Sequence, residues 1–548
     1  MKSNREKNLA KAKNRAYFLM FLLLILMGAA GRSLAKVSGD AEYVAAAGQQ
    51  SLYQLDIAKS RGTIYDCALR PITGSSKSWV AAVAPTIEAI GALETSTGGK
   101  YRDRLALALE NGKPFSLALD RPVKHECIDM FLVAQRYEED QPAPHLTGYL
   151  DSQGQGASGI ELAMDDALNR HQGQLSVYYQ VDALGRAIAG AKRMVADSME
   201  ETEGGVAAAI DLDIQKIAEE ASQNLGQGAV VVTEVPNCEI RASVSRPDFQ
   251  PNHIGEAAQR KDSPLVNRAF QAYAPGSVFK LVTAAVELES GQELKSFTCT
   301  GSLNAGGMLF QCYDGIAHGQ LDLTGAIENS CNCYFISAAR ALGGQPVLNM
   351  AYNLGLGVEQ EFGRGLFTAS GSLPAGESLS NPRALANFSF GQGEVTASPL
   401  QLCAMMNAIA SDGVYSSPKL IAGLIDSDGT FTPHKPVTDV TLSAMSRETA
   451  RQLQSCLINA AEKGTGSGGA PENCVSGIKT GTAQTGRYQN GQELSHFWYC
   501  GFLSDGSGPR YCVTVLKESA LQSGDTSRIF REIGERIAAL KFAPEAQP

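Results

Sequence analysis

The sequence has little of what would place it among nucleic-acid-binding or disordered proteins. Its 548 residues carry a formal net charge of −10, which argues against nucleic acid as a partner. It has no internal repeat and no long low-complexity segment. Hydrophobic residues make up 44% and charged residues 19%, as in globular proteins. A chain of this length is expected to form at least two folded domains.

Cysteine spacings typical of metal sites are also missing. Most of the 12 cysteines stand singly in apolar runs, which is typical of small core residues. The pair in Cys331-Asn332-Cys333 lacks metal spacing, and no partnering group of histidines or cysteines accompanies it. We therefore expect no metal site. Cys299 and Cys312 flank a glycine-rich turn and are the best candidates for a disulfide, a question that the sequence leaves open.

Only the N-terminus carries a strong positive charge. Residues 1–15 have six basic residues and one acidic residue, a net +5, and form a predicted cytoplasmic tail. Residues 16–35 are mostly apolar, their one charged residue is Arg32, which can reach the headgroups, and they are long enough for a transmembrane anchor. Because basic flanks stay inside, we expect a single-pass cell-membrane protein with a cytoplasmic N-terminus and an extracytoplasmic catalytic domain. A signal peptide cleaved near residues 28–31 is the alternative, and it also exports the rest.

The remaining chain divides into two regimes. Residues 36–204 alternate short apolar stretches with polar turns and end in an acidic, glycine-containing linker. Residues 205–548 begin with strands, continue through a helical block over 320–465, and return to strands before a final helix over 525–540. This order predicts an α+β fold with helices around an antiparallel sheet.

A possible nucleophile lies directly after Pro275-Gly276. Ser277 and Lys280 are three residues apart, so on a helix they share a face, and the amine can reach and activate the hydroxyl. A backbone N–H at the helix start is free to form half of an oxyanion hole. Lys280 must be neutral to accept a proton, and burial beside a second cation such as Lys479 favours that state. A serine and a lysine at this spacing also occur by chance in many helices.

A second motif is Ser330-Cys331-Asn332. Ser330 is suited to relay a proton between the lysine and the leaving amine, and the Asn332 amide is suited to hold a substrate carbonyl. The same residues are also common as a plain cap at a helix start.

The third motif is Lys479-Thr480-Gly481-Thr482, on a predicted strand. Gly481 would let a substrate backbone lie against the strand as an added one. Lys479, Thr480 and Thr482 together form a receptor for a carboxylate, and the Thr482 N–H can complete the oxyanion hole. An ordinary strand end with a turn glycine is the alternative. Three such motifs in this order make coincidence an unattractive explanation.

The three motifs together resemble those of penicillin-binding proteins and class A β-lactamases. The wider pattern resembles class B penicillin-binding proteins over most of residues 60–540. Its departures, Cys67-Ala68-Leu69-Arg70 and Pro236-Asn237-Cys238, avoid the proposed site. The further segments that carry the resemblance are residues 61–66, 145–149, 156–161, 267–269, 273–277, 318–319, 390–393, 398–401 and 479–484.

This resemblance implies a penicillin-binding transpeptidase domain over residues 205–548, preceded by a pedestal over 36–204. It implies a D,D-transpeptidase that cross-links peptidoglycan stem peptides through an acyl-enzyme on Ser277 and that β-lactams inhibit. Lys280 would be the base and Ser330 the relay, while Asn332 and residues 479–482 would bind the peptide. No metal or cofactor is required. The glycosyltransferase motif of class A proteins is missing, so a membrane glycan polymerase of the SEDS type is the implied partner.

Other functions remain compatible with the three motifs. A β-lactamase would need a group that activates water for deacylation, and a D,D-carboxypeptidase would release D-alanine without cross-linking. A non-catalytic division scaffold or penicillin sensor would keep the fold alone. The sequence leaves open the role in division, elongation or sporulation, the acceptor amine and the oligomeric state.

Overall fold

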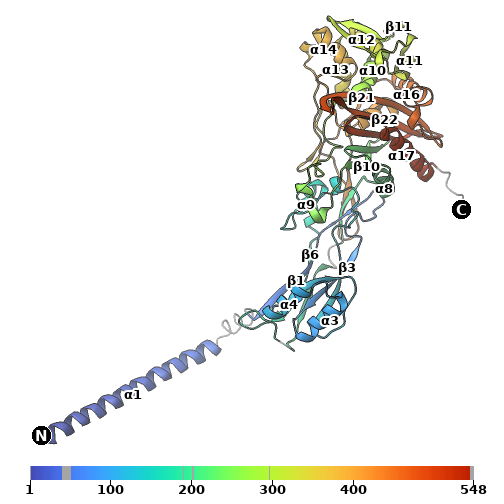
Figure 1. Ribbon diagram of the computed structural model, residues 1–548. Helices are drawn as coiled ribbons and strands as arrows, with labels where there is room; N and C mark the ends of the chain where they lie inside the picture. Colours follow the sequence, from blue (N-terminus) through green and yellow to red (C-terminus); the bar gives the residue numbers. More distant parts are fainter. Residues whose placement is uncertain (1, 40–50, 189, 200–202, 295, 543–548) are drawn as a thin grey trace. The chain divides into compact units, whose positions relative to one another are not determined.

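The computed structural model describes residues 2–39, 51–188, 190–199, 203–294 and 296–542 (Figure 1). The chain forms two compact units, each made of separate segments. The first comprises Met1–Lys59, Lys77–Ala134 and Gly173–Glu200, and the second comprises Ser60–Ser76, Gln135–Gln172 and Glu201–Pro548. Two segments inside the predicted pedestal, residues 60–76 and 135–172, therefore belong to the same compact unit as the C-terminal part of the chain.

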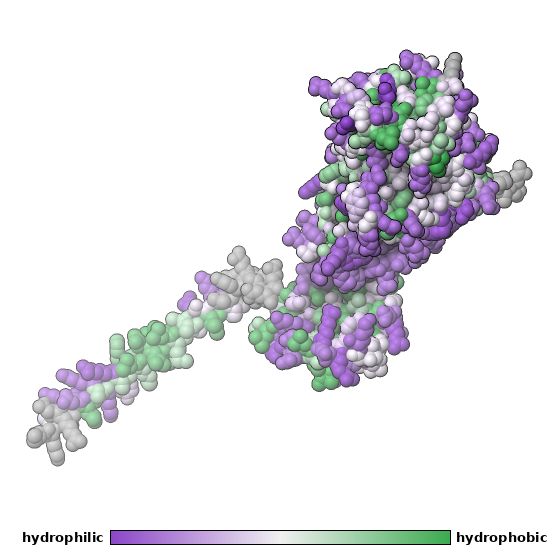
Figure 2. All heavy atoms as spheres, turned by 45° about the horizontal axis from the view of Figure 1, so that its top comes forward, coloured by the Kyte–Doolittle hydropathy of each residue, from purple (hydrophilic) through white to green (hydrophobic). Residues whose placement is uncertain are grey.

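The first unit begins with one long helix, α1 (Lys2–Gly39). Within Lys7–Lys36, an 18-residue window has a mean hydropathy of 2.0, and none of that window is buried. Figure 2 shows the apolar section as a continuous band around the helix. The helix is long and apolar enough to cross a membrane, and it contains the predicted apolar segment 16–35.

The rest of the first unit contains two small sheets and two helices. In one sheet β3 lies between β4 and β5, and in the other β6 lies between β1 and β7. Ala81 and Val83 of β3 pack in one core with Leu93 and Leu105 of the helices α3 and α4. The bounds are β1 Leu52–Ser60, β3 Lys77–Val83, α3 Ile87–Thr97, α4 Arg102–Asn111, β4 Phe115–Leu119, β5 Ile128–Ala134, β6 Gly173–Gln180 and β7 Met194–Asp197.

The second unit is built on a five-stranded antiparallel sheet with the order β10-β9-β23-β22-β21. Successive side chains of each strand point to opposite faces, so the sheet has two apolar faces. In β9, Val230 and Val232 pack on one side, whereas Ala229 and Val231 pack on the other. The strands are β9 Gly228–Glu234, β10 Glu239–Arg246, β21 Val475–Gln489, β22 Gln492–Asp505 and β23 Gly508–Ala520.

Helices cover both faces of this sheet. Figure 1 shows α8 (Leu212–Ala221) and α17 (Asp525–Lys541) on one side and the helical block on the other. The prediction of an α+β fold, with helices around an antiparallel sheet, is confirmed. The helical block comprises α10 Lys280–Ser290, α11 Leu323–Glu328, α12 Asn332–Leu342, α13 Gly344–Asn353, α14 Pro382–Ser389, α15 Pro399–Ala410 and α16 Arg447–Glu462.

A four-stranded sheet, with the order β19-β18-β8-β2, explains why residues 60–76 belong to the second unit. The strand β2 (Thr63–Tyr65) pairs in parallel with β8 (Gly205–Ala208), and β8 pairs with β18 (Ile421–Ile425). Next to β2, Arg61 donates to the buried Glu161 carboxylate at 2.8 Å, and Arg136 donates to the same carboxylate at 2.6 Å. These ion pairs tie residues 135–172 to the same unit.

The remaining elements are α5 Pro144–Thr147, α6 Gly159–Ala163, α7 Asp165–Asn169, α9 Ile254–Gln259, β11 Phe297–Cys299, β12 Ser302–Ala305, β13 Met308–Gln311, β14 Gly319–Leu321, β15 Glu361–Gly363, β16 Leu366–Phe367, β17 Val414–Ser416, β19 Phe431–Pro433, β20 Thr441–Ser443, η2 Pro251–His253, η3 Gly276–Phe279, η4 Tyr313–Gly315, η5 Gly376–Ser380 and η6 Ser467–Gly469.

Candidate active site

Ser277 lies in a short 3₁₀ turn, η3 (Gly276–Phe279), that leads into α10 at Lys280. The sequence predicted an α-helix at this point. A 3₁₀ turn superimposes residues three apart, so the shared face expected for Ser277 and Lys280 is kept. The turn depends on Gly276, whose φ is +54° and whose Cβ, if present, would lie 2.4 Å from the Thr482 carbonyl oxygen. The serine therefore sits directly against β21.

The three predicted motifs converge on the hydroxyl of Ser330. Its Oγ lies 3.1 Å from Lys280 Nζ and 2.9 Å from Lys479 Nζ, so it bridges two lysines that come from distant parts of the chain. Ser330 itself adopts a left-handed backbone conformation with φ +52°. Residues other than glycine rarely adopt this backbone conformation, and such strain concentrates at functional sites.

Along the chain, Lys280 is 50 residues and Lys479 is 149 residues away from Ser330. Contacts over such distances come from the fold, because α10, the turn before α12 and β21 are far apart in the sequence.

The amine of Lys280 has three oxygen partners. Its Nζ donates to the Ser330 carbonyl at 2.6 Å, to the Ser330 hydroxyl at 3.1 Å and to Asn332 Oδ1 at 2.7 Å. No hydrogen bond joins Ser277 Oγ to Lys280 Nζ in the described part of the chain. The expected hydrogen bond between these two residues is therefore absent from this arrangement, in which the lysine is bound by the second motif.

The role expected for Asn332 also differs in one respect. Its Oδ1 accepts from Lys280, and its Nδ2 donates to the Gln311 carbonyl at 2.8 Å. The amide thus orients the lysine and fastens the end of β13, whereas the sequence suggested that it holds a substrate carbonyl. The cap of α12 is Cys331, whose sulfur accepts from the Tyr334 N–H, and not Ser330.

Burial sets the protonation of the two lysines. Lys280 and Lys479 are both fully buried, and removal from water disfavours the charged form of an amine. Burial lowers the pKa of Lys280 to about 7, against an opposing effect of nearby cysteines. Burial, followed by the charge of Lys280, lowers the pKa of Lys479 well below its ordinary value. Activation of Ser277 requires a neutral lysine near physiological pH. The buried surroundings of Lys280 favour that state.

The third motif lies on an edge strand. β21 pairs with β22 on one side and is the last strand of its sheet, so it can accept an added strand. Thr482 is exposed there, and Thr480 Oγ1 donates to Thr465 Oγ1 at 3.0 Å. A Cβ on Gly481 would lie 2.9 Å from the Pro275 carbonyl oxygen. The segment that leads into η3 therefore fills the space beside Gly481. This close packing is sufficient to explain why a glycine stands at this position.

Several residues that support the site were not singled out from the sequence. Trp498 of β22 donates its Nε1–H to the Ala274 carbonyl at 2.9 Å and so fixes the loop before the serine. The Phe335 ring lies 5.8 Å from Lys280 Nζ. The Gln311 carbonyl accepts a hydrogen bond from Asn332 of the second motif, and Thr465 accepts one from Thr480 of the third. None of these residues has a local sequence signal, because each acts through a contact made by the fold.

The expectation that the cysteines have no partnering group is wrong. Cys299, Cys312, His318 and Cys331 come together, with their ligand atoms all within 4.8 Å of one another. The cysteines are free, and Cys299 Sγ lies 3.7 Å from Cys312 Sγ, too far for a disulfide bond. The candidate disulfide is therefore not formed in this structure.

A recess of about 1520 Å³ lies elsewhere in the second unit, lined by charged residues of α8 and the segment after β10. None of the motif residues lines it. The convergence of the three motifs, and not the size of a cavity, identifies the candidate site.

Comparison with known proteins gives the family. Residues 228–536 match the family model described as the penicillin-binding protein transpeptidase domain. The chain belongs to the penicillin-binding protein transpeptidase family, and its relatives are class B proteins.

Two curated relatives illustrate the similarity. The peptidoglycan D,D-transpeptidase PbpA of Mycolicibacterium smegmatis is 30% identical over 70% of this chain and 78% of its own length. Stage V sporulation protein D of Bacillus subtilis is 28% identical over 70% of this chain and 60% of its own length. The chain spans about 60% of the length of the first curated relatives that it matches.

Solved structures share the fold. Penicillin-binding protein 3 of Mycobacterium tuberculosis, complexed with aztreonam, has a TM-score of 0.65 at 20% identity and covers 90% of this chain and 99% of its own. A D,D-transpeptidase domain from Eggerthella lenta has a TM-score of 0.63 at 22% identity, covering 88% and 99%.

Proposed function

We propose that this protein is a peptidoglycan D,D-transpeptidase that forms an acyl-enzyme on Ser277 and is inhibited by β-lactams. The observation that carries the proposal is the Ser330 hydroxyl, placed between two buried lysines at 3.1 and 2.9 Å and beside an edge strand. Family membership supports the same reaction, and the relative PbpA is named as a peptidoglycan D,D-transpeptidase.

In the first half-reaction, Ser277 Oγ attacks the carbonyl carbon of the penultimate D-alanine while neutral Lys280 takes the hydroxyl proton. The backbone N–H groups of Ser277 and Thr482 stabilise the oxyanion. The C–N bond then breaks, and the terminal D-alanine leaves as an amine that receives its proton through Ser330. An ester on Ser277 remains.

In the second half-reaction, an amine of another stem peptide attacks the ester. It loses a proton through the same relay, forms the cross-linking amide and restores the Ser277 hydroxyl. The Ser330 hydroxyl suits this relay because it can donate to neutral Lys280 while accepting from Lys479. Lys479, Thr480 and Thr482 bind the peptide carboxylate. Before substrate binds, Lys280 is held by Ser330 and Asn332, and such hydrogen bonds are commonly rearranged in the substrate complex.

The helix α1 acts as a single-pass anchor with its basic end in the cytoplasm and everything that follows the helix, in both units, outside. Because the sequence has no glycosyltransferase motif, a SEDS-type glycan polymerase supplies the strands that this protein cross-links. Protease added to intact spheroplasts tests the orientation: the two units should be degraded, and their protection would contradict it.

The reaction is tested with the full-length protein, a donor stem peptide, an acceptor amine and labelled penicillin. We expect a cross-linked product and a stable adduct on Ser277, both lost in Ser277→Ala and kept in the exposed control Ser455→Ala. Rapid turnover of penicillin would favour a β-lactamase, and release of D-alanine without cross-linking would favour a carboxypeptidase. Full complementation of a deletion strain by Ser277→Ala would favour a scaffold or sensor.

A further inference from the structure

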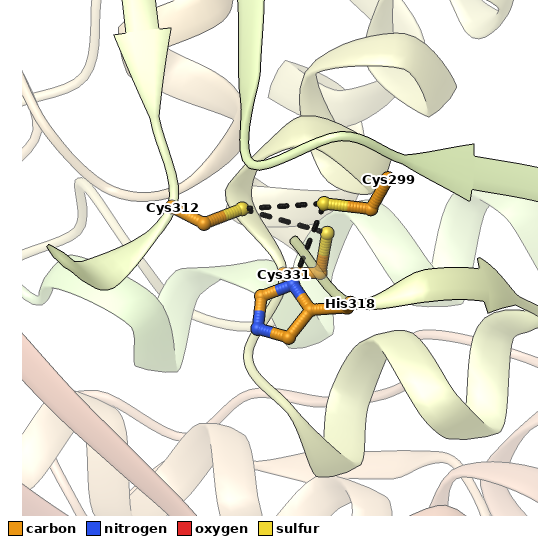
Figure 3. A group of neighbouring side chains, drawn as sticks. All are labelled: Cys299, Cys312, His318 and Cys331. Carbon is orange, nitrogen blue, oxygen red and sulfur yellow. Dashed lines mark hydrogen bonds between the residues drawn. The ribbon is translucent and has the colours of Figure 1, made fainter. Parts of the chain in front are cut away.

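Four metal-ligating side chains converge behind the second motif, in a group that the proposed reaction does not use. Cys299 ends β11, Cys312 follows β13, His318 precedes β14, and Cys331 caps α12 (Figure 3). The three cysteines are buried, and His318 is partly exposed. The four residues are called the sulfur cluster below.

Three of the six distances within the sulfur cluster are those of a tetrahedral metal site. Cys312 Sγ lies 3.7 Å from both Cys299 Sγ and Cys331 Sγ, and Cys299 Sγ lies 3.4 Å from His318 Nδ1. Around a tetrahedral zinc ion, with bonds of about 2.3 Å to sulfur and 2.0 Å to nitrogen, two sulfurs are about 3.8 Å apart and sulfur and nitrogen about 3.5 Å apart. The three observed distances match these values.

We propose that Cys299, Cys312, His318 and Cys331 bind one zinc ion as a structural site. Three sulfurs and one imidazole form a donor set that zinc prefers, and four protein ligands leave no open position for chemistry. The ion therefore takes no part in acyl transfer.

Backbone groups hold two of the sulfurs in place. The Gly301 N–H donates to Cys299 Sγ at 3.4 Å, and the Tyr334 N–H donates to Cys331 Sγ at 3.4 Å. Outer-shell hydrogen bonds of this kind orient the ligands of metal sites. Cys333 Sγ also lies 3.6 Å from Cys312 Sγ, beside the four ligands.

A disulfide is the main competing explanation, since exported proteins commonly form them. A bond between two sulfurs requires about 2.05 Å, well short of 3.7 Å, and it would leave the third cysteine and His318 without a reason to converge. A zinc ion accounts for all four residues.

The zinc ion would position the catalytic motif. Cys331 lies between Ser330 and Asn332, which hold Lys280, and Cys312 follows Gln311, whose carbonyl accepts from Asn332. A metal bound to both cysteines fastens these two segments together behind the lysine. This positioning role rests on the proposed function, whereas metal binding does not.

The test measures metal in the full-length protein, purified without oxygen after expression with zinc. We expect about one zinc per chain, and, after exchange with cobalt, the strong visible absorption of a tetrahedral thiolate site. His318→Ala and Cys299→Ser should lose both signals. The matched control Cys474→Ser should keep them, and His318→Cys should restore them as a four-sulfur site.

Absence of zinc and cobalt binding in the unmodified protein would overturn the proposal, and so would a disulfide involving Cys312 found by mass spectrometry in place of metal. Equal metal content in His318→Ala and the unmodified protein would overturn it as well. The unmodified chain decides the question even if a variant fails to fold. Because metal content is measured without substrate, its failure is distinguishable from failure of the transpeptidase proposal.

Discussion

Two groups of buried side chains meet at the turn that contains Ser330, Cys331 and Asn332, and they differ in how their polar atoms are satisfied. On one side, Lys280 and Lys479 find oxygen acceptors within the protein, at 2.6–3.1 Å. On the other side, three sulfurs and an imidazole face one another with few donors between them. The lysine group is complete without a further component, whereas the sulfur cluster gains most from a cation at its centre.

This difference assigns different tasks to the two sides. The lysine group holds protons that a reaction can move, because burial brings the pKa of Lys280 to about 7. The sulfur cluster holds backbone segments in place and leaves the reacting atoms alone. Variants on the lysine side should therefore change acylation strongly, and variants on the sulfur side should change it weakly.

The largest effect is expected for Lys280→Met, which keeps most of the length of the side chain and removes its amine. Without a base for Ser277, acylation by labelled penicillin should fall by about 10²- to 10⁴-fold. The second-order rate constant of acylation measures the change. Lys419→Met, at a partly exposed position outside the three motifs, is the control. Near-normal acylation by Lys280→Met would remove the lysine from the mechanism.

Replacement of Ser330 should have the next largest effect. Loss of the bridging hydroxyl should slow acylation by about 10- to 100-fold, in Ser330→Ala and Ser330→Gly alike. The two variants differ in stability, because glycine accepts the left-handed φ of +52° and alanine does not. Thermal unfolding should therefore place the glycine variant above the alanine variant by about 1 kcal/mol. A large difference between their acylation rates would mean that strain, and not the hydroxyl, governs the site.

How far the sequence predicts these features depends on where the information lies. Ser277, Lys280, Ser330 and Lys479 belong to ordered motifs, so their convergence could be expected, as could the antiparallel sheet with its helices. The partners of Asn332 could not, because the Gln311 carbonyl is a backbone group with no sequence signal.

The division into units shows a similar limit. Residues 60–76 belong to the second unit because β2 pairs in parallel with β8, about 140 residues further along the chain. Local sequence patterns do not predict a pairing between such distant segments. The sulfur cluster was missed for the same reason. Its four ligands lie in or beside four different elements, and their spacing matches no short metal motif.

The pH dependence of acylation should show a smaller, graded effect. Below the pKa of about 7, Lys280 is protonated and cannot accept a proton, so the rate should rise with pH and level off above that value. One pH unit below the pKa, the rate should be about tenfold lower than the plateau. Lys479 and the thiols of Cys312, Cys331 and Cys333 face the same region, so Cys333→Ser should be compared with the unmodified protein. A flat profile across this range would contradict the assignment of Lys280 as base.

Removal of zinc should have the smallest effect on acylation, because the ion touches none of the reacting atoms. Treatment with a chelator should lower the thermal midpoint, since a structural metal contributes its binding free energy to folding. Acylation should fall only a few-fold, as the segments of Gln311 and Asn332 loosen behind Lys280. The same treatment of His318→Ala, which already lacks the metal, should change neither quantity. If chelation instead abolished acylation at a temperature where the protein stays folded, the two groups would not have separate tasks, and zinc would have to act on the reacting atoms.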